Sequence, residues 1–338
     1  MITLFDTATE RQLELLRYDA SAREQVAKML RQLGLEVEAL IGGVQFDRLT
    51  DFQSRRARRL LAQIKATLGQ GYGDIGAWMD DQLAALVTIQ AQWGVEVLAP
   101  ALGISFAGLP GPDMLEALAR GKLIQGSLIE DWWSRQESSM QFRGAGIIRS
   151  GIVNGASNDQ IARSMRDLFE IAQRDAMALV RTAVQSVANE AMSGLYQANR
   201  DIVQGYVALA TLDSRTTIEC AARNLLRWDM EGRPVGHALP FRKPPLHWNC
   251  RTVLMPWLKS DGEALGGGRS SDEGYVAADL SFDAFLQRKD RDYLDRMLGK
   301  GRAQLYLDKK LTLIDLLDQR GNRLPLDELA RKAERVRR

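Results

Sequence analysis

The chain has 338 residues, with 45 Lys and Arg against 43 Asp and Glu and a formal net charge of +2. This balance removes any strong case for a nucleic-acid binder, because such proteins usually carry a pronounced basic bias. The length suits two or three modest domains, and the hydrophobic content of 45% is ordinary for a chain that buries a core. The first residues predict no secretory signal, and no apolar run approaches the length needed to cross a bilayer, so we expect no membrane anchor. Two cysteines are too few for a disulfide scaffold, so we expect folding in a reducing cytoplasm.

Residues 1–110 are predicted to form a helical arm or bundle. Apolar side chains recur there at helical spacing between Arg, Glu and Gln residues. The glycines of segment 69–73 are expected to break the helical pattern, and residues 103–112 are predicted to form a loop from their Gly and Pro content. Such an architecture fits packing against other subunits better than housing a catalytic pocket. The expected helices cover residues 13–40, 46–68 and 75–98.

Residues 111–200 are also predicted to be helical. Ser157-Asn-Asp-Gln160 is a capping-box sequence, in which the Ser and Gln side chains satisfy each other's backbone N–H groups. The helix that starts there is expected to break near Ile171-Ala172 and to continue from Gln173 to Asn199. The second part has a largely apolar face, so we interpret this helix–turn–helix outline as a core element and not as a DNA reader.

Residues 201–259 are predicted to form a small α+β module around a short sheet. Residues 203–211 and 251–257 have the composition of strands. A short helix is expected after Thr216 and a turn at residues 230–234. The fold class is therefore α+β, predominantly helical.

The remaining residues are predicted to form a linker and a helical tail. Gly, Ser and Asp dominate residues 260–275, which is typical of a flexible linker. Residues 276–338 return to short amphipathic runs, which predict a helical C-terminal tail.

Both cysteines and both histidines of the chain lie between positions 212 and 256. His247 and Cys250 are three residues apart, a spacing that lets both side chains reach one metal ion. Cys220 could supply a third ligand and His237 a fourth, because structural zinc takes four tetrahedral N and S ligands. The sequence contains no Cys-x-x-Cys knuckle, however, and the spacing matches no standard zinc finger.

Several arrangements of these side chains remain open. We favour two buried thiols with a histidine hydrogen-bonded to the backbone or to Asp213 over a zinc site. A disulfide is the third arrangement, since sequence cannot place the sulfurs within bonding range. A nucleophilic cysteine–histidine pair would need an orienting third group and an oxyanion loop, and the sequence shows neither.

The segment Asp213-Ser-Arg215-Thr216 is interpreted as structural. Asp, Ser and Thr before a short helix are good N-caps. The Asp213 carboxylate can pair with the guanidinium of Arg181 or Arg251, and bidentate pairs of this kind fix geometry well. Such a pair would hold the loop that contains Pro244 and Pro245 against the neighbouring strand.

This region resembles the phage Mu F-like minor head (head morphogenesis) proteins. In that family an Asp-x-Arg-Thr turn precedes a cysteine, here Cys220, and a Pro-rich His-x-x-Cys-Arg segment follows, here Pro244–Arg251. Arg181-Thr182 matches an upstream Arg-Thr pair, and Leu298–Leu305 resembles the family's tail. Many members carry a second cysteine two residues after the Cys-Arg cysteine. This chain has Thr252 there, so one potential metal ligand is missing.

The resemblance implies a non-enzymatic phage minor head protein that acts in capsid assembly. It implies docking on the portal protein or the inner capsid, with an effect on DNA packaging or ejection. The major capsid or scaffolding protein and the packaged DNA are further expected partners. The protein would be made in the host cytoplasm and end in the virion, in the capsid interior or portal region. The alternative is a small hydrolase or transferase that uses Cys220, His247 and Cys250 and is delivered with the phage genome.

Overall fold

The computed structural model describes residues 4–44, 51–106, 123–259, 267–308 and 311–336, and a few positions between 107 and 122. The chain divides into two compact units. One comprises residues 1–16, 86–118 and 185–338, and is called here the sheet unit. The other comprises residues 17–85 and 119–184, and is called the bundle unit.

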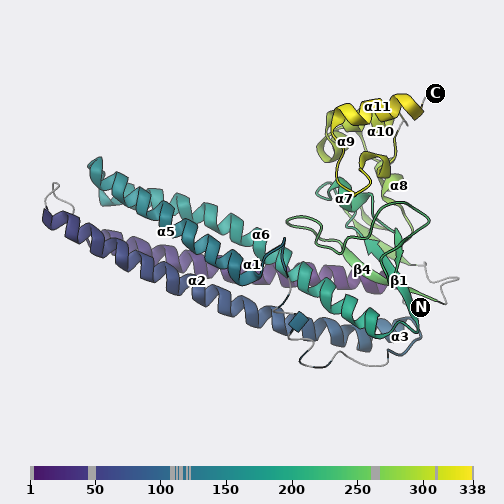
Figure 1. Ribbon diagram of the computed structural model, residues 1–338, viewed down its shortest axis with the longest axis horizontal. Coiled ribbons are helices and arrows are strands. Elements are labelled where there is room, and N and C mark those ends of the chain that lie inside the picture. The colour runs from purple at the N-terminus through teal and green to yellow at the C-terminus, as the bar shows by residue number, and fades with distance from the viewer. Residues whose placement is uncertain are drawn as a thin grey trace. The chain divides into compact units, whose positions relative to one another are not determined.

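The fold is predominantly helical with a small antiparallel sheet, which confirms the predicted α+β class (Figure 1). The long helices are α1 (Leu4–Gly42), α2 (Asp51–Trp93), α5 (Ile129–Val153) and α6 (Asn158–Ala198). The short ones are η1 (Gly94–Leu98), α3 (Ala99–Ala101), α7 (Ile218–Ala221), α8 (Phe282–Leu286), α9 (Arg291–Leu298), α10 (Lys300–Leu307), η2 (Ile314–Leu316) and α11 (Leu326–Val336). The strands are β1 (Val203–Leu209), β2 (Arg227–Asp229), β3 (Pro234–Val235), β4 (Val253–Leu258), β5 (Gly268–Ser271) and β6 (Gly274–Ala277).

The bundle unit consists of segments of α1, α2, α5 and α6 that run alongside one another (Figure 1). Each helix buries an apolar stripe, as the helical spacing of its apolar residues predicts. Polar contacts join α1 to its neighbours: the Tyr18 hydroxyl donates to the Gln82 carbonyl over 2.8 Å, and Arg166 pairs with Glu38. The stripe of α1 includes Val26, Leu30, Leu33, Val37 and Ile41. The stripe of α2 includes Leu60, Ile64, Leu68, Ile75 and Met79.

The glycines at 69–73 do not break the second helix, contrary to the prediction. Helix α2 runs without interruption from Asp51 to Trp93. A Cβ at Gly71 would lie 2.6 Å from Cδ1 of Leu33, so this glycine allows close packing of α1 against α2. Tertiary packing therefore outweighs the low helix propensity of glycine here.

Helix α6 also continues through the break expected near Ile171-Ala172. The buried apolar stripe passes through Ala172, so the helix has no reason to end there. The capping box is present as predicted. The Gln160 N–H donates to Oγ of Ser157 over 3.2 Å, and the Ser157 N–H donates to Oε1 of Gln160 over 2.8 Å.

One helical stretch, Arg55–Ala101, is long and apolar enough by length and composition to cross a membrane. The sequence prediction that no apolar run reaches this length was therefore wrong. In the structure 44% of the most apolar window is buried inside the protein. The core helix of a globular protein meets the same criteria, so the stretch by itself is weak support for a membrane span.

The sheet has the strand order β3-β2-β1-β4, and all of its pairs are antiparallel. Its two longest strands, β1 and β4, are those predicted from the sequence. They pair from Val203 opposite Leu258 to Leu209 opposite Val253. At Gly205 a Cβ would lie 2.0 Å from the carbonyl oxygen of Trp228 on β2, so the strands can approach only because the side chain is absent.

The described part of the predicted linker, residues 260–275, overlaps a β hairpin that ends at Ala277. Residues 260–266 lie outside the described residues, and strands β5 and β6 follow. The Arg269 side chain on β5 is buried, and its guanidinium donates to the Ala210 carbonyl and to Oδ1 of Asn224. The Gly- and Ser-rich composition suits a hairpin turn as well as a linker, so it could not reveal these contacts. Within the loop predicted at 103–112, residues 107–110 and 112 also lie outside the described residues.

The helical tail, α8 to α11, packs on the region around α7. One apolar cluster contains buried side chains of both parts. Cys220 and Cys250 belong to this cluster, together with Leu212, Ile218, Phe282, Phe285, Leu294, Leu313, Leu316 and Leu329. The tail thus covers the segment in which the cysteines lie.

Candidate functional site

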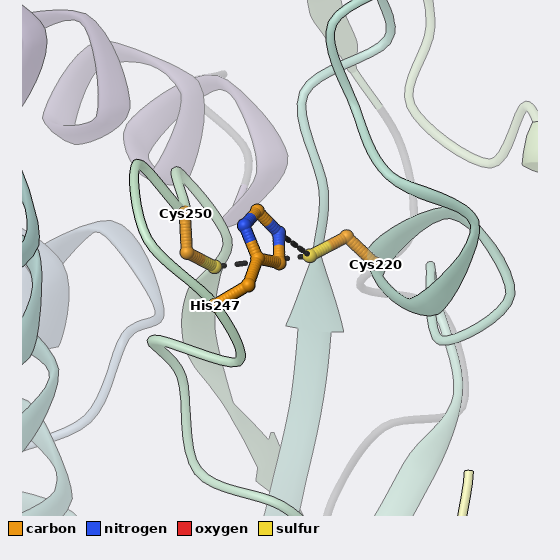
Figure 2. A group of neighbouring side chains, drawn as sticks. All are labelled: Cys220, His247 and Cys250. Atoms are coloured by element: carbon orange, nitrogen blue, oxygen red, sulfur yellow. Dashed lines mark hydrogen bonds between the residues drawn. The ribbon is translucent and has the colours of Figure 1, made fainter. Parts of the chain in front are cut away.

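Cys220, His247 and Cys250 form a compact group inside the sheet unit (Figure 2). Sγ of Cys220 lies 3.2 Å from Nε2 of His247 and 3.7 Å from Sγ of Cys250. The three ligand atoms all lie within 4.8 Å of one another. Both cysteines are buried and His247 is half-buried. The sequence prediction that these side chains could reach one point is therefore matched by the geometry.

Local backbone structure positions each member of the group. Cys220 lies on the single turn of α7. His247 and Cys250 lie on the two ends of a turn, in which the Cys250 N–H donates to the His247 carbonyl over 3.2 Å. Asn249 adopts φ 62°, a left-handed conformation that Asn tolerates better than most residues. The turn brings residues three apart in sequence to the same side of the chain.

The tautomer of His247 follows from its second nitrogen. Nδ1 lies 2.7 Å from the carbonyl oxygen of Trp248. A carbonyl only accepts, so Nδ1 carries the proton and donates it. In the neutral ring Nε2 is then unprotonated, and its lone pair faces Sγ of Cys220 (Figure 2).

The two thiols differ in acidity. A hydrogen bond from the Cys220 thiol, together with the contact to His247, holds the pKa of Cys250 well below its usual range despite burial. The same hydrogen bond and burial raise the pKa of Cys220. Burial opposes charge on His247, but its hydrogen bond to Cys250 and the charge of that sulfur raise its pKa.

The geometry separates the arrangements that the sequence left open. The sulfurs are 3.7 Å apart and both cysteines are free, whereas a disulfide needs about 2.05 Å. Both thiols are buried, and His247 bonds to a backbone carbonyl and not to Asp213. The three ligand atoms also form a set that could hold a metal ion.

His237 is not part of this group. Its Nε2 lies 2.8 Å from the Arg227 carbonyl, and its Nδ1 accepts the Leu239 N–H over 3.2 Å. Its ring contacts the edge of Trp228, with centroids 4.8 Å apart. Both nitrogens are thus occupied by the backbone, and the expected fourth ligand is not brought to the cysteines.

A buried ion pair lies next to the group in sequence. Asp213 and Arg251 form two hydrogen bonds, Nη1 to Oδ2 over 2.6 Å and Nη2 to Oδ1 over 2.7 Å. The Thr216 hydroxyl lies 2.5 Å from the Thr211 carbonyl and 3.1 Å from Oδ1 of Asp213. Burial opposes ionisation of Asp213, but the hydrogen bonds and charge of Arg251 prevail and lower its pKa. This bidentate pair fixes the residue that follows Cys250.

The other predicted motif residues have separate roles. Arg181 pairs with Asp19 of α1 over 3.1 Å, within the bundle unit, and not with Asp213. The Thr182 hydroxyl donates to the Ala178 carbonyl, one helical turn earlier. The Arg215 side chain is 78% exposed and reaches Asp213 over 3.4 Å. Pro244 and Pro245 are joined by a cis peptide bond, and Pro244 is buried.

Sequence reasoning missed the polar residues that hold the start of β4. Gln185 and Asn189 of α6 both donate to the Thr252 carbonyl over 3.0 Å. Gln12 of α1 donates to the Arg251 carbonyl over 3.1 Å. The only available signal was a polar residue on an otherwise apolar helix face, which is too common to single these positions out. Their role depends on contacts between residues that are far apart in sequence.

Comparison with known proteins gives one match. A family model described as Phage Mu protein F like protein matches residues 146–255, about a third of the chain. The matched segment runs from the end of α5 through α6 and the sheet into β4, and it includes all three members of the cysteine–histidine group. No curated protein and no solved structure matches the chain.

Proposed function

We propose that the chain is a phage minor head protein that docks on the portal protein, because residues 146–255 match the phage Mu F-like family of head morphogenesis proteins. The inner capsid, with its major capsid or scaffolding protein, is the other expected contact. Docking would affect DNA packaging or ejection. Such a family implies a place in the virion. Assembly in the host cytoplasm and a position at the portal belong to the proposal.

The family match is the observation that carries this proposal. The bundle unit adds physical support, because it presents apolar side chains that its own core does not cover. Phe142 of α5 is 81% exposed, Val153 at the end of α5 67%, and Leu35 of α1 60%. Exposed aromatic and aliphatic side chains of this kind are typical anchors of protein interfaces.

Leu35 borders two hollows of the bundle surface. One, of about 900 Å³, lies between α1 and α2, where Met29, Leu33 and Gly71 also line it. The other, of about 360 Å³, lies between α1 and α6 and is lined by Gly34 and Phe169 among others. A partner helix could place apolar side chains on either side of Leu35. We assign the portal contact to this face.

Co-expression with the portal protein encoded beside its gene, followed by affinity purification and native mass spectrometry, tests the proposal. We expect a complex of defined copy number. Leu35→Glu should reduce the recovered portal protein at least about tenfold, since burying an unpaired charge at an interface is costly. Leu307→Glu on α10, at a side chain that is 44% exposed in the sheet unit, is the matched control and should leave the complex intact. A wild-type chain that binds neither portal nor capsid protein contradicts the proposal.

The contact between Cys220 and His247 is the observation that favours the alternative, a cysteine-dependent hydrolase or transferase. Other features count against it. The two cysteines are only 2% and 1% exposed, and Nδ1 of His247 bonds to a carbonyl and not to an orienting carboxylate. The family is one of structural head proteins, so a non-enzymatic role is the better supported one.

A further inference from the structure

We infer that the chain binds one zinc ion through Sγ of Cys220, Sγ of Cys250 and Nε2 of His247. The inference rests on the arrangement of these three side chains and not on the proposed role in head assembly. The ion would serve as a structural link inside the sheet unit. It would join the turn of α7 to the turn that leads into β4.

The distances fit tetrahedral zinc. With Zn–S bonds of about 2.3 Å and Zn–N bonds of about 2.05 Å, tetrahedral angles place two sulfurs about 3.8 Å apart and a sulfur and a nitrogen about 3.6 Å apart. The observed Sγ–Sγ distance is 3.7 Å and the Sγ–Nε2 distance is 3.2 Å. Both values lie within about 0.4 Å of this geometry, and the third pair, Nε2 of His247 and Sγ of Cys250, lies within 4.8 Å.

The orientation of His247 supports the same conclusion. A histidine that binds zinc almost always donates its other ring N–H to a carboxylate, a backbone carbonyl or water, which fixes the ring and its tautomer. Nδ1 of His247 makes this contact with the Trp248 carbonyl over 2.7 Å. The ring is therefore held with an unprotonated Nε2 next to Sγ of Cys220 before any metal arrives.

Charge balance favours a divalent cation at this position. The sulfurs lie in an apolar cluster with Leu212, Ile218 and Leu246, where an uncompensated thiolate is costly. Binding of Zn²⁺ by two thiols and a neutral imidazole forms two Zn–S bonds and one Zn–N bond. The protons of the thiols pass to solvent, and the two thiolates cancel the charge of the ion.

The three protein ligands leave one coordination position. Among the residues that the structure describes, no further His, Cys, Asp or Glu joins the group. A water molecule would complete the tetrahedron on the side where His247 is partly exposed. The small sheet and the short helices around it would gain stability from such a link, because binding energy in a folded-state site adds to folding energy.

Metal analysis of the full chain tests the inference. The protein is purified without added chelator and its zinc content is measured by inductively coupled plasma mass spectrometry and by native mass spectrometry. We expect one zinc per chain. Replacement by Co²⁺ should give the intense visible and sulfur-to-metal absorption bands of a tetrahedral thiolate site. Removal of zinc by a chelator should lower the Tm, and zinc addition should restore it.

Variants locate the site. Cys220→Ser, Cys250→Ser and His247→Asn should each lower zinc occupancy at least about tenfold, in line with loss of a direct ligand. His237→Asn is the matched control, because both of its ring nitrogens contact the backbone, and it should keep one zinc per chain. If a ligand variant fails to fold, cobalt absorption of the wild-type chain still decides the question.

Two outcomes would overturn the inference. One is a wild-type chain that takes up neither zinc nor cobalt in stoichiometric amount after reduction. The other is zinc retained in both cysteine variants. A mass two daltons below that of the reduced chain would mark a Cys220–Cys250 disulfide in the purified protein. If the chain then binds no metal after reduction, the inference is likewise overturned.

Discussion

Each unit of the chain is stabilised internally by a different kind of contact. The bundle unit buries apolar stripes, and among the described residues its buried polar side chains are only those of Asp19 and Thr182. The sheet unit buries many polar and charged side chains. They include Arg11, Gln12, Gln90, Gln185, Asn189, Asp213, Thr216, Arg223, Asn224, Thr252 and Arg269.

The difference follows from the length of the elements. Helices as long as α2 satisfy their own backbone groups and need only an apolar face to pack. The sheet unit has short strands and long connections, whose N–H and C=O groups must find partners elsewhere. Arg11 shows the result: its guanidinium bonds to the carbonyls of Ala188 and Leu254. Burial lowers the pKa of Arg11 to about 10. In this unit polar side chains thus supply hydrogen bonds to backbone groups that regular secondary structure leaves without a partner.

The largest expected effect tests whether the sheet unit depends on such contacts. Asp213→Ala leaves the buried Arg251 guanidinium without its carboxylate, which should lower the free energy of unfolding by about 3–5 kcal/mol. Urea unfolding followed by circular dichroism and tryptophan fluorescence measures it. Arg215→Ala is the control in the same motif. Its side chain is 78% exposed, so the loss should stay below about 1 kcal/mol. Equal losses in the two variants would contradict the contrast between the units.

A smaller effect tests whether packing alone governs the bundle unit. Gly73→Ala places a methyl group in open space on α2 and should stabilise the protein by about 0.5–1 kcal/mol, through helix propensity. Gly71→Ala gains the same propensity but brings Cβ to 2.6 Å from the buried Leu33 side chain. Overpacking of about 1–3 kcal/mol should then make this variant less stable than Gly73→Ala. Thermal unfolding compares the two, and an equal rise in Tm for both would show that α1 and α2 are not closely packed at Gly71.

The smallest expected effect is the pH dependence of the Asp213 contribution. The pKa of Asp213 lies below its ordinary value of 3.8, because Arg251 outweighs the effect of burial. A lowered pKa in the folded state means that the stabilisation is complete above the unfolded-state pKa and is lost as the pH falls through the folded-state value. The difference in unfolding free energy between wild type and Asp213→Asn should therefore be constant near neutral pH and shrink below about pH 4. A difference that grows on acidification would show that the carboxylate is not stabilised by Arg251.

Much of the fold could be predicted where a local pattern carries the information. Helical periodicity predicted that these regions are helical, but not that α2 and α6 are continuous, and the capping box predicted the start of α6 at Asn158. Strands β1 and β4 followed from their composition. Strands β2 and β3 are two or three residues long, too short for any periodic pattern, and became strands only by pairing with β1 and with each other.

The candidate site divides in the same way. The spacing of His247 and Cys250 and the clustering of both cysteines predicted that these side chains could meet. Sequence could not rank His237 below them, because its contacts with the Arg227 carbonyl and Trp228 depend on the position of β2. Nor could the sequence choose the partner of Asp213. Arg181 and Arg251 carry the same functional group, and sequence does not show which of them lies close to Asp213 in the fold.

The sequence by itself thus determined the fold class, the main helices and strands, and the family to which residues 146–255 correspond. The tertiary structure alone decided that glycines continue α2, that β5 and β6 lie where a linker was expected, and which polar side chains are buried. The physical reason is the range of the interactions. Periodicity, capping and turn formation act between residues close in sequence, whereas Gly71 facing Leu33 or Arg269 reaching Ala210 joins residues far apart.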